Sequence, residues 1–407
     1  MKGSLRRLTH ARAALPRALG LCAALLGGGC APDFNPQWEV EEPRIFTAKI
    51  VIEDDSEGRT RPRPGERFSI HYYLMSPGRP QASYSADAAL CAGASLTDGT
   101  LACIDEVPLD SVMLAPYEGN DQLVLTGLLV PELPDDLPPP FDELTQISMF
   151  GALCVDGTIE RAPGTNIATD SVPHLFQCTD NATSAFPALL PFSMAIKLDL
   201  GDPGQLNHHP SFACDDDDPN SPCTRGVEHE LEDDETITTP GPIILAYPEK
   251  EAEGAARERL WEAWDPAVEL PWDDCASAPD TLPKVYAETK DYKVYVRVDA
   301  RDRETYEREI RANEGTEIEE TREEIVVSHA ITTKGGKVDS YSSVVRNDAA
   351  DDAAEIEVEY TPPRQSEQED EHIADTGTLV RFYFALRDQR GGVDFTTREL
   401  CVLPPKD

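Results

Sequence analysis

The chain has 407 residues, of which 76 are acidic and 36 are basic, and its formal net charge is −40 at pH 7. This length is enough for two or three folded domains. An apolar content of 40% is too high for a wholly disordered chain. The excess of negative charge argues against nucleic acid as a partner, because a phosphate backbone would be repelled.

The first 29 residues have the pattern of a secretory signal peptide. They contain five basic residues and no acidic residue, and a short apolar run at 18–26 leads into three glycines. The apolar run is too short to span a membrane comfortably. We therefore expect residues 1–29 to be removed on export, which leaves 31 basic and 76 acidic residues in the mature chain.

Cys30 follows this segment directly. Small residues before a cysteine, after an apolar run, resemble a bacterial lipobox, whose cysteine is lipidated and becomes the mature N-terminus. The resemblance implies that the membrane is a partner, reached through a lipid on Cys30, and that residues 30–37 form a tether. Ala31 stands where an aspartate is linked to inner-membrane retention, so the outer membrane is favoured. A secreted or periplasmic protein is the alternative.

Eight further cysteines remain in the mature chain, and an even number in an exported protein indicates disulfides. Eight cysteines allow about a hundred different connectivities, so the pairing is a hypothesis based on proximity in the sequence. No Cys-x-x-Cys pair occurs, which disfavours a thiolate metal site. The favoured pairs are Cys91–Cys103, Cys154–Cys178, Cys214–Cys223 and Cys275–Cys401.

Alternation of apolar and polar residues with a period of two predicts half-buried antiparallel strands. The clearest runs cover residues 45–52, 68–74, 192–198, 294–298, 356–360 and 380–386. The 34 prolines and 26 glycines are frequent between these runs, as turns require. We therefore expect an all-β fold built from β-sandwiches, with acidic loops and little helix.

Helix is expected at two places only, over residues 248–264 and near residues 302–311, where Glu and Arg are frequent. The mature chain divides into two domains by composition. The predicted boundaries are residues 38–209 for the first domain, 210–240 for an acidic linker, and 241–407 for the second domain.

Several short motifs are shared with a known group of proteins. They are Asn207-His208-His209-Pro210, Arg303-Glu304-Thr305-Tyr306, Arg322-Glu323-Glu324 and Arg387-Asp388-Gln389-Arg390-Gly391-Gly392-Val393-Asp394. Together with the lipobox they resemble uncharacterised surface lipoproteins of myxobacterial-type bacteria. The resemblance implies two immunoglobulin-like domains and a surface location, and it implies no activity. Taken alone, the last motif predicts a hairpin turn with two glycines, and a binding site there is the alternative.

The strongest candidate for a ligand site is an acidic run between Cys214 and Cys223. Calcium prefers six to eight oxygen ligands, and a short loop closed by a disulfide could supply several of them. An exposed acidic linker is the competing interpretation. The candidate calcium ligands are Asp215, Asp216, Asp217, Asp218 and Asn220.

The sequence contains no nucleophile elbow, P-loop or dinucleotide-binding motif. We therefore expect a non-enzymatic cell-envelope lipoprotein that acts as an adhesion, scaffold or interaction module. No catalytic residue and no cofactor is assigned, apart from the possible calcium. The expected partner is an envelope or extracellular protein or a glycan. The alternatives are a calcium-dependent binding module, and an envelope enzyme without a recognisable motif.

Overall fold

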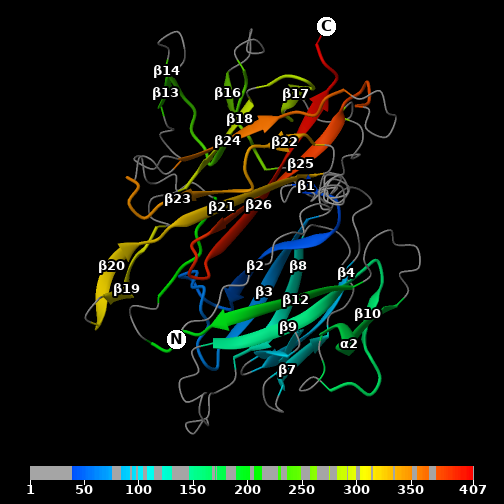
Figure 1. The fold of residues 1–407 in the computed structure, drawn as a ribbon, viewed down its shortest axis with the longest axis vertical. Coiled ribbons are helices and arrows are strands. Elements are labelled where there is room, and N and C mark those ends of the chain that lie inside the picture. Colours follow the sequence, from blue (N-terminus) through cyan, green and yellow to red (C-terminus); the bar gives the residue numbers. More distant parts are fainter. Residues whose placement is uncertain are drawn as a thin grey trace, which may run out of the picture. The chain divides into compact units, whose positions relative to one another are not determined.

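The fold is known from a computed structural model, and it confirms the prediction of an all-β protein (Figure 1). The residues that the structure describes are 39–75, 84–91, 94–97, 100–103, 108–113, 122–130, 146–166, 170, 172–179, 189–201, 206–212, 228–230, 236–248, 257–263, 275, 282–290, 292–298, 303–312, 315–332, 335–350, 355–365 and 373–406.

The first sandwich is built from two antiparallel sheets, with the strand orders β2–β3–β8 and β12–β9–β4–β7. Apolar side chains of both sheets meet in one buried core, for example Phe68 and Ile70 of one sheet with Leu153 and Ile196 of the other. The strands are β2 (Arg44–Ile52), β3 (Arg67–Met75), β4 (Tyr84–Cys91), β7 (Pro108–Met113), β8 (Gln122–Leu129), β9 (Gln146–Val155) and β12 (Leu189–Lys197).

The second sandwich has one sheet in the order β1–β21–β25–β26–β17, with β23 also on β21, and a second in the order β16–β15–β18–β24–β22. Trp261 and Phe382 are fully buried in the core between the sheets. The strands are β1 (Glu39–Val40), β15 (Ile243–Ala246), β16 (Glu258–Leu260), β17 (Lys284–Tyr286), β18 (Tyr292–Arg297), β21 (Ile325–Thr332), β22 (Lys337–Val338), β23 (Ser342–Val345), β24 (Glu355–Thr361), β25 (Thr378–Arg387) and β26 (Val393–Leu403).

Both sandwiches follow the immunoglobulin strand plan. In chain order, β2, β3, β4, β8, β9 and β12 pair as strands A-B-E and C-F-G do in that fold, and β15, β18, β21, β24, β25 and β26 repeat the scheme. The range 38–209, predicted as the first domain, includes one strand of the second sandwich, because β1 pairs with β21.

Four short ribbons and one helical turn complete the described part. They are β5 (Ala94–Thr97) with β6 (Thr100–Cys103), β10 (Thr158–Arg161) with β11 (Phe176–Thr179), β13 (Glu228–Glu230) with β14 (Thr236–Thr238), β19 (Thr305–Ala312) with β20 (Gly315–Arg322), and α2 (Val172–Leu175).

The two predicted helices are wrong wherever the structure describes them. β16 occupies Glu258–Leu260 and pairs with β15, which carries Trp261 into the core, where its indole N–H donates to the Glu399 carbonyl at 2.8 Å. β19 occupies Thr305–Ala312. Its charges are satisfied across a hairpin, as in the 2.9 Å ion pair of Arg308 with Glu319, instead of along a helix face.

Two disulfides of the predicted set are present. Cys154 bonds to Cys178 across a separation of 24 residues, and Cys275 bonds to Cys401 across 126 residues. Structural disulfides of this kind indicate an oxidising compartment outside the cytoplasm. In the described ranges, no helix has both the length and the apolar character that a membrane span requires.

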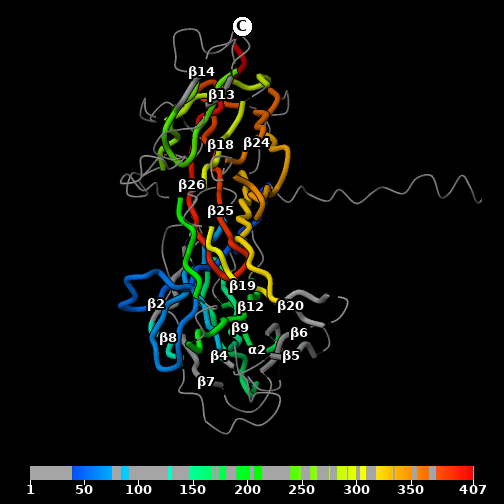
Figure 2. The backbone as a smooth tube through the Cα atoms, turned by 90° about the vertical axis from the view of Figure 1, so that its left-hand side faces the viewer, coloured from blue at the N-terminus to red at the C-terminus, as the bar shows by residue number. Residues whose placement is uncertain are grey.

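Residues 37–407 form one compact unit. Within the larger unit, the hairpin of β25 and β26 extends beyond the second sandwich and contacts β2 of the first (Figure 2). Lys49 on β2 forms a 3.1 Å ion pair with Asp394 on β26. This contact region is the junction, defined here by the 388–392 turn, residues 206–212 and the neighbouring parts of both sandwiches.

Candidate functional site at the junction of the two sandwiches

The turn between β25 and β26 is shaped by the side chain of Asp388. Its Oδ1 accepts the backbone N–H groups of Arg390, Gly391 and Gly392 at 2.7, 2.9 and 2.8 Å. Gly391 has a φ of 121°, which an L-residue with a side chain rarely adopts. The turn interpretation of this motif is therefore correct, and Asp388 is its central group.

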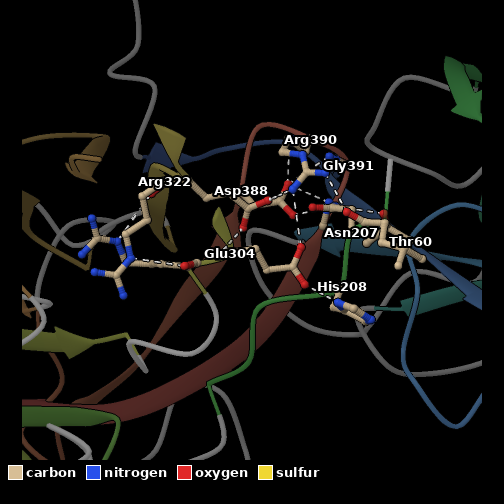
Figure 3. A network of polar contacts seen from close by, with 12 residues as sticks. Thr60, Asn207, His208, Glu304, Arg322, Asp388, Arg390 and Gly391 are labelled. Carbon is tan, nitrogen blue, oxygen red and sulfur yellow. Dashed lines mark hydrogen bonds and ion pairs between the residues drawn. The ribbon is translucent and has the colours of Figure 1, made fainter. Parts of the chain in front are cut away.

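Asn207 attaches this turn to the first sandwich. Its Nδ2 donates to Asp388 Oδ2 at 2.8 Å and to Thr60 Oγ1 at 2.9 Å, and Asn207 is only 1% exposed. The backbone N–H of Thr60 also donates to the Asn207 carbonyl at 2.9 Å. A single amide thus joins the β2–β3 connection, the segment after β12 and the β25–β26 turn (Figure 3).

Arg390 is the cation at the centre of the junction. Its Nη1 donates to Glu323 Oε1 at 2.6 Å and to Glu304 Oε2 at 3.4 Å, while its Nη2 donates to the Leu206 carbonyl at 2.7 Å. The guanidinium also lies over the ring of Tyr306, 4.3 Å from the centroid, in a cation–π contact. Arg390 therefore holds the base of the β19–β20 hairpin against the segment that leaves the first sandwich.

Glu323 is 1% exposed, although it carries a carboxylate. Burial raises the pKa of Glu323 to about 7, and the negative charge of Asp388 acts in the same direction, while the bond from Arg390 opposes it. Its second oxygen accepts the backbone N–H of Glu304 at 3.1 Å. Both carboxylate oxygens of Glu323 thus accept hydrogen bonds that hold the junction together.

Two consecutive histidines complete the polar part. His208 pairs with Glu304 through Nδ1, so that the first motif meets the second. His209 contacts both sandwiches through its ring: the Val393 N–H donates to Nδ1 at 3.0 Å, and Nε2 bonds to the Ile50 carbonyl at 2.6 Å. At Gly392 there is no room for a side chain, because a Cβ would lie 2.6 Å from the His208 carbonyl oxygen.

The junction also has an apolar part. Phe395 of β26 stacks on Tyr73 of β3 with ring centroids 4.3 Å apart, and it meets Phe46 of β2 edge-on at 6.1 Å. Arg387 donates to the Phe46 carbonyl at 2.7 Å and lies over the ring of Phe46. Buried aromatic area therefore accompanies the polar network and contributes non-directional stabilisation.

A groove of about 270 Å³ runs beside β2 at the junction. Its lining includes Lys49, Ile50, Asp55, Arg59 and His209. Asp55 and Arg59 are already paired with each other at 3.2 Å, and Lys49 is paired with Asp394. Three of the charged side chains that line the groove are thus already paired within the protein.

The predicted ligand residues are not among those that the structure describes. Cys30 and the calcium candidates Asp215, Asp216, Asp217, Asp218 and Asn220 lie outside the described residues, as do Cys214 and Cys223, so these predictions stay open. Cys91 and Cys103 are described by their backbone only, on β4 and β6. Among the described residues, no group of three or more His, Cys, Asp or Glu side chains could hold a metal ion.

The junction brings together the motifs that were singled out in the sequence. Asn207, Glu304, Glu323 and Arg390 each come from a different motif and lie within one bonded network. No contact between these motifs was predicted from the sequence, and Thr60 was not among the residues singled out. The available signals in the sequence were charged residues beside paired glycines and a short polar segment ahead of a proline. Nothing in a single sequence indicates that these motifs meet in the fold.

No family model matches the sequence, and no curated protein matches it. Among solved structures, the chain is similar to red sea bream transglutaminase, with 8% identity and a TM-score of 0.18. The alignment covers 88% of this chain, which spans only 32% of the transglutaminase chain. A similarity of this size carries no argument about function.

This comparison corrects one expectation. A non-enzymatic protein was expected from the sequence, whereas the solved structure to which the chain is matched is an enzyme. The prediction that the protein has no catalytic activity is therefore withdrawn. No activity is assigned in its place, because the TM-score of 0.18 is too low to support one.

Proposed function

We propose that the chain is an exported outer-membrane lipoprotein, anchored through a lipid on Cys30, whose two sandwiches act together as one adhesion, scaffold or interaction module. The partner is an envelope or extracellular protein or a glycan. The observation that carries the proposal is the buried bond pair of Asn207 to Asp388 and Thr60. Buried polar groups that are satisfied only when two units meet give a specific mutual arrangement, which a composite binding surface requires.

The proposed location in the cell is supported by three independent features. The first 29 residues have the basic, apolar and small-residue order of a signal peptide, and Cys30 follows them. The disulfides Cys154–Cys178 and Cys275–Cys401 need an oxidising compartment. The large negative charge of the mature chain would keep the folded body away from anionic lipid, so a covalent lipid would be the means of attachment.

The anchor is tested by intact-mass analysis of the protein taken from its native membrane. The wild type is expected to carry an adduct of diacylglycerol size on Cys30 and to partition with the outer membrane. Cys30→Ala should release the protein. Cys22→Ala is the matched control, because this cysteine leaves with the signal peptide and its loss should change nothing. Release of both variants, or an unmodified N-terminus in the wild type, would contradict the anchor.

The module is tested by chemical cross-linking on intact cells. The wild-type protein is expected to form discrete adducts with an envelope protein or with extracellular glycan. Asn207→Ala, which removes the two side-chain bonds of Asn207 at the junction, should reduce the yield of these adducts at equal surface abundance. An unchanged yield would mean that the two sandwiches bind independently and that the composite surface does not exist.

A further inference from the structure

His209 is the side chain whose two ring nitrogens each bond to a different sandwich. The Nδ1 atom accepts from the backbone N–H of Val393, the first residue of β26, at 3.0 Å. The Nε2 atom bonds to the carbonyl of Ile50 in β2 at 2.6 Å. The ring therefore spans the junction as a bridge between two main chains.

This pair of bonds defines the protonation state of the ring. A backbone N–H can only donate, so Nδ1 must be unprotonated, and a carbonyl can only accept, so Nε2 must carry the proton. The imidazole is neutral in this arrangement. A second proton, on Nδ1, would place an N–H group against the N–H of Val393 and break that bond.

The segment around His209 is bonded to both sandwiches. Pro210 is buried, and Phe212 lies in the core of the second sandwich with its N–H bonded to Asp394 Oδ2 at 2.9 Å. The N–H of His209 itself donates to the Gly58 carbonyl at 3.2 Å. The segment is thus held at both ends, with the ring of His209 between them.

The charged groups that face the ring come from three elements. Lys49 of β2 disfavours a proton on His209, while Asp394 of β26 and Asp388 of the turn favour it. Burial is the largest influence, and it lowers the pKa of His209 to about 4. Asp55, Glu57 and Arg59 line the same groove.

We propose that His209 is an acid-sensitive latch, in which protonation of Nδ1 breaks the bond to Val393 and opens the junction between the two sandwiches. In the unfolded chain a histidine binds its proton near pH 6.5, well above the value in the fold. The stabilisation by His209 is therefore fully present above pH 6.5 and is lost progressively as the pH falls toward about 4. The latch does not depend on a lipid on Cys30.

The test is small-angle X-ray scattering of the mature chain between pH 8 and pH 3. We expect a constant radius of gyration above pH 6.5 and an increase as the pH falls toward about 4. His209→Gln keeps one donor and one acceptor but cannot take up a proton, so the acid transition should disappear or move down by at least about one pH unit. Asp394→Asn tests whether this carboxylate causes the transition instead of His209. Because the substitution removes a charge that favours the proton on His209, the transition should remain and move to lower pH.

An identical transition in His209→Gln and wild type would overturn the proposal, as would its loss in Asp394→Asn alone. If His209→Gln does not fold, nitrogen NMR of the histidine rings in the wild-type chain decides. The expected result is a neutral ring with the proton on Nε2 down to about pH 5. A ring that titrates at its ordinary value, or that carries its proton on Nδ1, would contradict the latch.

Discussion

Asp388 uses its two carboxylate oxygens for different tasks. Oδ1 accepts three backbone N–H groups and so fixes the shape of the β25–β26 turn, whereas Oδ2 accepts the amide of Asn207 from outside the turn. A carboxylate that accepts several N–H groups is both well ordered and expensive to leave unpaired. The fold of the hairpin and its attachment to the first sandwich therefore depend on one side chain.

Asn207→Ala removes both bonds of this amide. It leaves Asp388 Oδ2 and Thr60 Oγ1 buried without that donor, so we expect a loss of about 1–3 kcal/mol in the free energy of unfolding. Chemical denaturation of the mature chain measures it. Asn166→Ala, at an exposed position in the first sandwich, is the matched control and should stay within about 0.5 kcal/mol. Equal effects of the two substitutions would show that Asn207 does not hold the junction.

Glu323 has the opposite pH behaviour to His209. Its pKa is raised from 4.5 to about 7, so the folded chain holds this proton more tightly than the unfolded chain does. Stability attributable to Glu323 is therefore present below pH 4.5 and decreases as the pH rises toward about 7. Glu323→Gln keeps an acceptor for Arg390 and cannot ionise, which removes this decrease.

The measurement is urea unfolding of wild type and Glu323→Gln at pH 5 and pH 8. The variant should gain stability relative to the wild type on going from the lower to the higher pH, because only the wild type places a new negative charge in the junction. A difference between the two proteins that does not change with pH would contradict the raised pKa.

At the scale of elements, the strands could be predicted and their partners could not. The runs at 68–74, 356–360 and 380–386 lie within β3, β24 and β25, because alternation reports which residues of one strand face a core. Residues 257–263 and 303–311 were misread as helix, since Glu and Arg favour helices when no partner strand is considered. In both cases tertiary pairing outweighed local propensity.

The contacts of the junction could not be predicted from the sequence, for a physical reason. Asn207 and Asp388 are 181 residues apart, and Arg390 lies 67 residues from Glu323. In a chain with 76 acidic side chains, nothing local distinguishes the carboxylates that are buried in ion pairs from those in water. Only the hairpin turn itself could be predicted, because its glycines act on the backbone directly.

The two disulfides are expected to differ in their contribution to stability. In the chain-entropy model, a loop of about 15 residues is worth about 3 kcal/mol and one of about 100 residues about 4.7 kcal/mol. Here the separations are 24 residues for Cys154–Cys178 and 126 for Cys275–Cys401. Replacing both cysteines of the longer loop with alanine should therefore lower the midpoint of chemical unfolding more than the same change in the shorter loop. The reverse order would refute the loop-length argument.

In the whole molecule, we expect the two sandwiches to unfold as one cooperative unit. Their main cores are separate, yet buried bonds and aromatic contacts join the sandwiches at the junction. In addition, β1 precedes the first sandwich in the chain and pairs with β21 of the second, so the chain crosses between the sandwiches more than once. Such an interface couples the unfolding of both parts, whereas two domains on a flexible linker unfold independently. A composite binding surface is possible only in the coupled case.

Differential scanning calorimetry of the mature chain at neutral pH tests this coupling most directly. The account predicts a single transition in the wild type, with a calorimetric enthalpy equal to the van't Hoff enthalpy. The combined variant Asn207→Ala and Arg390→Ala should show two transitions, because it removes the central bonds of the junction and leaves both cores intact. Two separate transitions in the wild-type protein would contradict the claim that the sandwiches are joined into one unit.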